Sequence, residues 1–369
     1  MAKNKTVEMQ SEEKRMKADS MQFHLIEHNN RDIPTLEERK MSGKDYLFYG
    51  ADNDFPKYLW DLYLHSAIMQ GIVNGTIDYV SGNEVISELG EINNDGDTIT
   101  DLIRKITTDY MVYGGFAVQI LRDYNENISE MYWLDVKELR SDPNEKYIYY
   151  SKDWNKYGSK AVKYERFDAS KKQPNSIFYY KGHLTRGVYP VPRYIGALAA
   201  IETSTEIGKF HLRNILNNLS SSALINFNNG VPTATEQKAI ENKIKEKFSG
   251  ADNAGKFILS FNDNKESAAT IERLAEDRMD EKFNTLKKSV VDEIFIAFRA
   301  QPALFGMKME NTGFSLVEFE ESFNLYNKTV VIPIQKDIKR CFTKIFGREI
   351  IDFIPFSLEG GNNGSVSNK

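Results

Sequence analysis

Residues that could form a catalytic or metal site are few and widely spaced in this sequence. The five histidines are His24, His28, His65, His183 and His211. The sequence contains no HExxH motif, which would hold a catalytic zinc ion, and His211 is interpreted as a residue on a helix surface. The single cysteine, Cys341, excludes a disulfide within the chain and a zinc site with several cysteine ligands. The sequence therefore predicts no metal centre.

Two carboxylates and a pair of glycines are the remaining candidates for a reactive site. Asp52 and Asp54 stand on either side of Asn53 in GADNDFP, where they could hold a metal ion, but Asx-rich stretches before a proline are usually turns. Gly114 and Gly115 are interpreted as the tight start of a strand. The sequence contains neither a GxxxxGK[ST] phosphate loop nor a GxSxG elbow. We therefore predict no catalytic residue and no cofactor.

Length and composition favour a folded protein that does not bind nucleic acid by charge alone. The chain has 369 residues, of which 41% are hydrophobic, enough to bury a substantial core. Its formal net charge of -5 argues against a protein that covers phosphates with lysines and arginines. The apolar runs are too short to span a bilayer, and the N-terminal residues lack the apolar core of a signal peptide.

The first half of the chain is predicted to combine helices with a strand-rich region. Apolar residues recur at helical spacings over 56–80, which predicts one or two packed helices, and 102–111 predicts another. From 113 to 183, short β-rich runs alternate with turn sequences such as DYNEN and SDPNE. This alternation predicts mainly strands. The polar residues at both ends of the chain are expected to be flexible.

The second half is predicted to hold two long helices separated by a small α/β segment. Pro192 is placed in the first turn of a helix over 192–219, and the second helix covers 274–300. Between them, SALINF, KFILSF and AATIERL predict strands. Thr233 and Glu236 form a capping box that predicts the start of an intervening helix.

A third long helix is predicted after the apolar connection QPALFGMKMENTG. Ser315 and Glu318 form a capping box, and Phe314 and Phe319 occupy the positions of a hydrophobic staple. These features fix where the helix begins and in which direction it starts. Pro333 lies well inside the helical pattern and removes one backbone hydrogen bond, so a kink is expected there.

The order of these segments resembles the portal protein of tailed bacteriophages over roughly residues 45–346. The resemblance is carried by FYGADNDFPKYLWDLYLHSAIMQGIVNGTIDYVSG, YMVYGGFAVQILRD, YPVPRYIGALAAIETSTEIGKFHLRNILNN, FSGADNAGKFILSF and FRAQPALFGMKMENTGFSLVEFEESFNLYNKTVVIPIQKDIKRCF. Each stretch by itself is ordinary helix and turn sequence. Their order and spacing carry the resemblance.

The resemblance implies an α+β portal-like fold and a division of the chain into named parts. These parts are a flexible N-terminal tail (1–30), a strand-rich α+β wing (31–190), a stem helix (191–220), an α/β clip (221–273), a second stem helix (274–300), a tunnel loop (301–313), a long kinked wing helix (314–347) and a short, partly flexible C-terminal tail (348–369). Many portals continue into a helical crown after the kinked helix, and residues 348–369 leave little chain for one.

The resemblance also implies a function and a set of partners. Portal subunits form a ring, usually a homododecamer, at one vertex of the capsid, where double-stranded DNA passes through without sequence specificity. The implied partners are the terminase large subunit, the major capsid protein or scaffold, and a head-tail adaptor. The implied location is the virion, after assembly in the cytoplasm of a bacterial host. No membrane, metal or cofactor is implied.

Two groups of site residues follow from this resemblance. The tunnel loop would present Met307, Lys308, Met309 and Asn311 to DNA, because flexible and weakly charged side chains can approach DNA without gripping it. The alternative for the loop tip is a buried connector between helices, and in either case Leu304 and Phe305 are expected in the core. The clip would offer docking residues for terminase or an adaptor, or else simply a solvated face, at Lys238, Lys243, Lys245 and Lys247.

Two competing functions remain open at this point. The chain could be another virion structural protein, such as a head-to-tail adaptor or a capsid-associated scaffold, with no loop that contacts DNA. It could also be a hydrolase whose carboxylates form no recognisable pattern. A ring with a central hole would exclude the hydrolase, and binding of the packaging ATPase to that ring would separate a portal from an adaptor.

Overall fold

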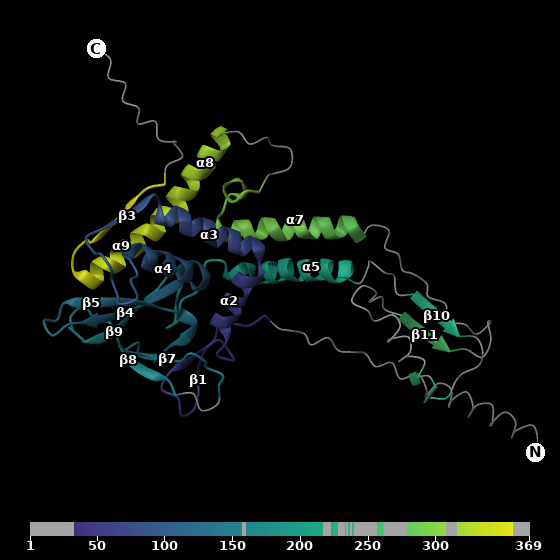
Figure 1. Ribbon diagram of the computed structural model, residues 1–369, viewed down its shortest axis with the longest axis horizontal. Helices are drawn as coiled ribbons and strands as arrows, with labels where there is room; N and C mark the ends of the chain where they lie inside the picture. The colour runs from purple at the N-terminus through teal and green to yellow at the C-terminus, as the bar shows by residue number, and fades with distance from the viewer. Residues whose placement is uncertain are drawn as a thin grey trace, which may run out of the picture. The chain divides into compact units, whose positions relative to one another are not determined.

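The structure of the chain is a computed structural model, shown in Figure 1. It describes residues 33–156, 160–216, 223–227, 233, 235–236, 238–239, 257–261, 279–307 and 316–356. The flexible tail expected at 1–30 lies outside these residues. So do the strand predicted for AATIERL and most of the helix predicted after Thr233.

Three helices form one side of the folded body. The apolar pattern over 56–80 forms two helices, α2 (Phe55–His65) and α3 (Ala67–Ser81), because the Ser66 side chain accepts a hydrogen bond from the backbone of Met69 and starts a new helix. Helix α4 (Ile99–Tyr113) begins with a capping box between Thr98 and Asp101. It ends at Gly114, whose φ of 82° suits a left-handed helix end.

A six-stranded sheet lies against these helices and confirms the strand-rich region predicted over 113–183. Its order is β5-β4-β9-β8-β7-β6. The strands are β4 (Gly115–Arg122), β5 (Ile128–Leu134), β6 (Leu139–Ser141), β7 (Tyr147–Tyr150), β8 (Val162–Arg166) and β9 (Asn175–Lys181). Neighbouring strands are antiparallel except β8 and β9. The buried side of the sheet packs on α4 and supplies much of the core.

Two-stranded sheets accompany the six-stranded one. β1 (Glu38–Lys40) pairs antiparallel with β2 (Leu47–Tyr49), and β3 (Glu84–Ser87) pairs antiparallel with β12 (Ile351–Ile354). β10 (Ala223–Phe227) and β11 (Phe257–Phe261) match the strands predicted from SALINF and KFILSF, and they run parallel. A parallel pair requires a crossover connection between its strands, and the described residues 235–236 and 238–239 of this connection are helical.

Two long helices, α5 (Leu198–Leu216) and α7 (Met279–Phe298), lie side by side (Figure 1). The sequence placed Pro192 in the first turn of the first of these helices, and this prediction is wrong. Residues Ile195–Ala197 form a 3-10 turn, and α5 begins only at Leu198. The ring of Tyr194 is buried and its hydroxyl donates to the Val112 carbonyl at 2.6 Å, so the backbone before Leu198 follows this contact instead of helical geometry.

The third long helix is interrupted just before Pro333, as the sequence predicted. Helix α8 (Leu316–Tyr326) runs into a π-helical turn (Asn327–Val331), and α9 (Ile332–Phe346) follows directly. Pro333 stands in the first turn of α9, where its missing N–H is tolerated. Gly347 ends the helix with a φ of 73°. The chain then turns into β12.

Candidate functional site

The α5–α7 pair is packed in the core at one end and carries exposed apolar side chains elsewhere. At the buried end, Ile201 of α5 and Ile294 of α7 are both fully buried. Leu212, farther along α5, is 56% exposed, and Ile296, only two residues after the buried Ile294 of α7, is 75% exposed. Phe210 and Leu286 are also exposed. Apolar side chains repeated along one helix pair are typical of a surface that another protein covers.

The residues after α7 are anchored to the body before the predicted tunnel loop begins. Pro302–Phe305 form a short 3-10 turn, which we call the anchored turn, and Leu304 is buried. The ring of Phe305 packs on those of Tyr79 and Tyr326, with centroid distances of 6.1 and 5.5 Å. It also occupies the space beside Gly75, where an added Cβ would come within 2.8 Å of the ring. The base of the loop is therefore fixed, and the prediction that Leu304 and Phe305 belong to the core is confirmed.

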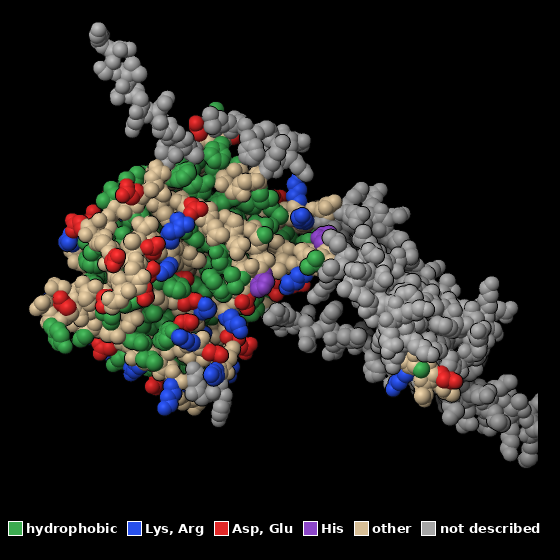
Figure 2. Space-filling model, viewed as in Figure 1, with side chains coloured by type: hydrophobic (Ala, Val, Ile, Leu, Met, Phe, Trp, Pro, Cys, Tyr) green, Lys and Arg blue, Asp and Glu red, His purple; other side chains and the backbone are tan. Residues whose placement is uncertain are grey.

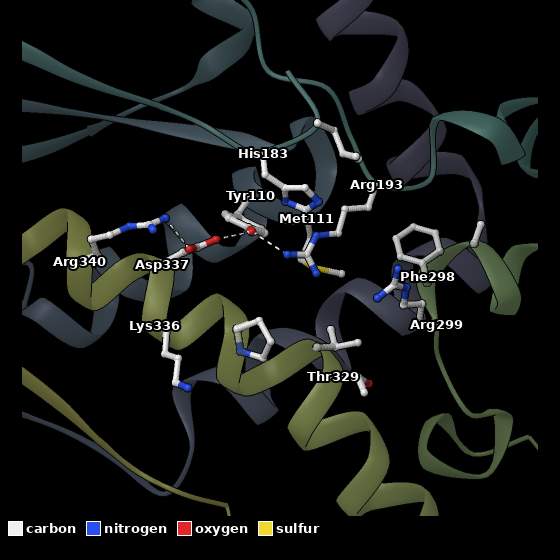
Figure 3. A pocket seen from close by; sticks show the side chains of 14 residues that line it. Tyr110, Met111, His183, Arg193, Phe298, Arg299, Thr329, Lys336, Asp337 and Arg340 are labelled. Carbon is white, nitrogen blue, oxygen red and sulfur yellow. Dashed lines mark hydrogen bonds and ion pairs between the residues drawn. The ribbon is translucent and has the colours of Figure 1, made fainter. Parts of the chain in front are cut away.

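A cavity of about 660 Å³ lies where α4, α7, α9 and the segment before α5 meet (Figure 3). Its basic lining residues are His183, Arg193, Arg299, Lys336 and Arg340. Asp337 is the one carboxylate among the described lining residues. Tyr110 and Phe298 supply aromatic walls, and Pro333 lies at the edge. We call this feature the basic cavity.

A chain of hydrogen bonds crosses the basic cavity. The Tyr110 hydroxyl accepts from Arg193 at 2.8 Å and donates to the Asp337 carboxylate at 2.9 Å. Tyr180 donates to the same Asp337 oxygen at 2.9 Å, and Arg340 forms an ion pair with Asp337 at 2.7 Å. Figure 3 shows the first part of this chain as a row of dashed lines. Asp337 is thus fully engaged by groups of its own chain, which ties α9 to α4 and β9.

Burial and charge set the ionisation of this network. Desolvation raises the pKa of Tyr110 to about 12, against a smaller lowering by the neighbouring Arg193. Desolvation also raises the pKa of Tyr180 strongly, and its contacts with Tyr110 and Asp337 act in the same direction. Desolvation raises the pKa of the Cys341 thiol on α9 to about 12. Both tyrosines therefore stay protonated at neutral pH and donate to Asp337.

Arg299 holds an unusual backbone conformation at the edge of the basic cavity. Its φ of 54° lies in the left-handed region, at the end of α7 where glycine is the common residue. A non-glycine residue in this region costs about 1 kcal/mol or more. The side chain is exposed, and it forms no ion pair with any described residue. The backbone N–H groups of Arg299 and Ala300 donate to the Ile296 and Phe295 carbonyls at 3.0 and 2.9 Å, which closes the helix.

A second arginine, Arg140, lies in a closed site elsewhere in the body. Arg140 is 2% exposed and has no carboxylate partner among the described residues. It donates from Nε to the Asn53 side chain, from Nη2 to the Asn53 carbonyl at 2.6 Å, and from Nη1 to the Leu139 carbonyl at 2.7 Å. The rings of Tyr49 and Trp154 cover the guanidinium. We call this arrangement the Arg140 site.

The Arg140 site shows which structural role the stretch GADNDFP has. Asn53 has a φ of 62° and accepts from the Tyr49 backbone, so the stretch is a tight turn, as predicted from its sequence. Asp54 accepts from Asn155 at 2.7 Å. Among the described residues, no group of three or more histidines, cysteines and acids is placed to hold a metal ion. The residue of the stretch that contacts Arg140 is Asn53, between the two acids.

The predicted DNA-contact residues fall mostly outside the described part of the chain. Met307 is described, and it lies just after the anchored turn with its backbone N–H donating to the Pro302 carbonyl at 3.1 Å. Lys308, Met309 and Asn311 lie outside the described residues. So do Phe314 and Ser315 of the predicted staple and capping box, whereas Glu318 is exposed and Phe319 packs on the core.

The predicted docking lysines are described at one position only. Lys238 is exposed in a helical stretch, and Lys243, Lys245 and Lys247 lie outside the described residues. The capping interaction predicted upstream is present, because the Glu236 carboxylate accepts from the Thr233 backbone at 2.9 Å. This contact lowers the pKa of Glu236. No helix among the described residues is long and apolar enough to cross a membrane.

Sequence reasoning did not find the basic cavity. Its residues come from segments far apart in the chain, and each basic side chain by itself has the appearance of ordinary surface charge. One local signal was available, because Arg299 follows a long helical pattern at a position where a glycine usually ends the helix. In the space-filling view, acidic and basic side chains are interspersed over the face shown, without one large area of a single sign (Figure 2).

Comparisons with known proteins agree with this architecture. The chain is 15% identical to a chain of the structure "Virion of native gene transfer agent (GTA) particle", with a TM-score of 0.55 and coverage of 88% of this chain and 86% of that one. For "Neck of empty GTA particle computed with C6 symmetry" the identity is 14%, the TM-score 0.55 and the coverage 91% and 93%. For "Neck of native GTA particle computed with C12 symmetry" these values are 14%, 0.53, and 83% and 86%. These likenesses show a shared fold.

The sequence itself identifies the family. A search of curated proteins finds no significant match. The sequence profile described as phage portal protein matches residues 73–368, which include the six-stranded sheet, the α5–α7 pair, the anchored turn and the α8–α9 helix. The chain belongs to the phage portal protein family.

Proposed function

We propose that the chain is the subunit of a closed ring, typically a dodecamer, that forms the DNA channel at one vertex of a virion. Membership of the phage portal protein family supports a structural role and not a catalytic one. The fold resembles chains of neck structures that were computed with C12 and C6 symmetry. In the ring, double-stranded DNA passes without sequence-specific contacts, and terminase, a capsid protein and a head-tail adaptor dock on the outside.

The observation that carries this proposal is the exposed apolar surface of the α5–α7 pair. Side chains such as Leu212 and Ile296 are more than half exposed in the isolated subunit. Copies arranged around an axis would bury these side chains against their neighbours. Mass measurement and negative-stain images of the purified full-length protein should show a ring with a central hole. A protein that stays monomeric at every salt concentration would overturn the proposal.

Within this ring, the residues after the anchored turn form the loop that approaches DNA. Phe305 and Leu304 hold the base of the loop on the body, and Gly306, with a φ of 76°, redirects the chain away from it. The loop then presents Met307, Lys308, Met309 and Asn311. Deleting residues 307–311 should leave the ring intact and impair packaging or retention of DNA. Normal packaged genome length and normal retention would show that the loop has another role.

The segment between α5 and α7 forms the docking surface for terminase and later for the adaptor. The parallel β10–β11 pair and the helical stretch that begins after Thr233 are inserted between the two long helices. Lysines 238, 243, 245 and 247 supply the charge of this surface. Reversing these charges should weaken terminase binding while the ring persists. Unchanged binding would place the docking surface elsewhere.

A further inference from the structure

The basic cavity carries more positive charge than the described residues of its own chain neutralise. Asp337 is already shared by Tyr110, Tyr180 and Arg340. Arg299 and Lys336 form no ion pair with any described residue, and Arg193 donates to a neutral hydroxyl. Figure 3 shows no dashed line to Lys336 or Arg299. Cations gathered in a concave site attract an anionic group, because the site focuses their field.

An apolar depression adjoins the basic cavity and shares Arg299 and Thr329 with it. Its lining includes Pro302 and the exposed side chains of Ile296 and Leu325. It also contains Asp292, so the combined surface is not uniformly cationic. Contact with DNA phosphates would leave these apolar side chains in water. An anionic ligand that also buries apolar surface is a protein segment with acids next to aliphatic residues.

The chain carries such a segment on α8. Val317 is 60% exposed, and Glu320 and Glu321 are exposed beside it at i+3 and i+4. Neither glutamate forms an ion pair with any described residue. We call this surface the acidic face of α8.

A single subunit cannot place this face in its own basic cavity. Glu320 and Lys336 belong to one nearly continuous helix, about 24 Å apart along its axis at 1.5 Å per residue. Glu320 precedes Leu325 by five positions, which turns it about 140° around the helix from the side that borders the depression, whereas Glu321 precedes Leu325 by four and lies on that side. The acidic face and Lys336 therefore lie well apart along the helix, so a contact between them joins two copies head to tail.

We infer that the basic cavity binds the acidic face of α8 from a second copy of this chain, and that this contact closes the ring. The inference rests on the proposed ring and names the residues that join its subunits. We call this contact between two subunits the joint. In it, Glu320 and Glu321 of one copy approach Arg299 and Lys336 of the next, and Val317 packs against Ile296 and Leu325. The joint adds negative charge to that of Asp337, which is already shared within the cavity. It also supplies a reason for an arginine in the strained position at the end of α7.

A charge-swap experiment with the full-length protein tests the joint. The cavity variant carries Arg299→Glu and Lys336→Glu, the helix variant carries Glu320→Lys and Glu321→Lys, and the third variant carries all four changes. At one fixed protein concentration, native mass spectrometry should show the ring fraction of either single-sided variant falling at least about tenfold, because like charges then meet in a buried contact. The combined variant should recover most of the ring.

Two controls separate the possible failures. Lys57→Glu with Lys160→Glu reverses the same number of exposed charges outside the cavity and should leave the ring fraction unchanged. Circular dichroism melting curves check that each variant folds. A wild-type chain that forms no ring overturns the proposed function itself. A wild-type ring that both single-sided variants retain overturns the joint alone, and rings that persist in the cavity variant while DNA binding falls would assign the cavity to DNA.

Discussion

The Arg140 site and the basic cavity both place an arginine where several elements meet, and they differ in what surrounds the guanidinium. At Arg140, backbone carbonyls and the Asn53 side chain accept from every nitrogen, and two aromatic rings close the site. In the basic cavity, Arg193 has one hydroxyl and Arg299 has no ion-pair partner among the described residues. An arginine without a carboxylate partner therefore indicates a ligand site only where the acceptors of its own chain leave some of its N–H groups without hydrogen bonds.

The comparison predicts its largest effect at the closed site. Arg140→Leu removes the donors that the buried Asn53 and Leu139 carbonyls accept from, and we expect it to lower the free energy of unfolding by about 3 kcal/mol. Lys336→Leu in the basic cavity should change it by at most about 0.5 kcal/mol. Urea unfolding of both variants at one protein concentration measures the contrast. Equal losses would show that the two sites do not differ in the way described.

A second prediction concerns the acceptor that closes the Arg140 site. Asn53→Gly keeps the left-handed backbone but removes the oxygen that accepts from Arg140 and from the Tyr49 backbone, so it should cost about 2 kcal/mol in urea unfolding. Asn53→Ala should cost about 1 kcal/mol more, because alanine is strained at this φ. If the glycine variant matches the wild type, the backbone carbonyls alone satisfy Arg140.

A third prediction concerns Tyr110, which links the cations of the basic cavity to Asp337. Tyr110→Phe should cost about 1 kcal/mol at pH 8, because Arg193 and Asp337 lose their shared partner. The pKa of Tyr110 is raised from 10.0 to about 12, so the contribution of its protonated form is complete below pH 10 and is lost as the pH rises through 12. The stability difference between wild type and variant should therefore shrink over that range. The exposed Tyr124 offers the control, since Tyr124→Phe should show no such trend.

The smallest predicted effect has the opposite sign. Arg299→Gly relieves the left-handed strain at the end of α7, and we expect it to stabilise the isolated subunit by about 0.5 kcal/mol. The same change should weaken the ring, because it removes a cation of the joint. Unfolding measured under conditions that dissociate the ring, together with the ring fraction itself, separates the two effects. A destabilised subunit would show that the Arg299 side chain has a structural role within its own chain.

Local sequence signals predicted most of the helices and few of the contacts between them. The sequence predicted the interruption before Pro333 and the two strands of the β10–β11 pair, because both features depend on residues close together in the chain. The start of α5 was predicted too early, since the buried Tyr194 contact with Val112 overrides the local preference. Sheet order was not predictable, because pairs such as Val118 with Phe178 join residues far apart in sequence. The basic cavity was missed for the same reason.

The π-helical turn between α8 and α9 has a consequence for how such a chain changes over evolutionary time. A π turn holds one more residue than an ordinary helical turn, which shifts the phase of the two flanking helices by about 100°. Tyr326 and Val330 keep their place in the core on either side of this shift. An insertion or deletion of a single residue at Asn327–Val331 would rotate all of α8 relative to the core, while α9 would keep its packing on the core. The orientation of one subunit's outer helix can thus be reset without rebuilding the body that carries it.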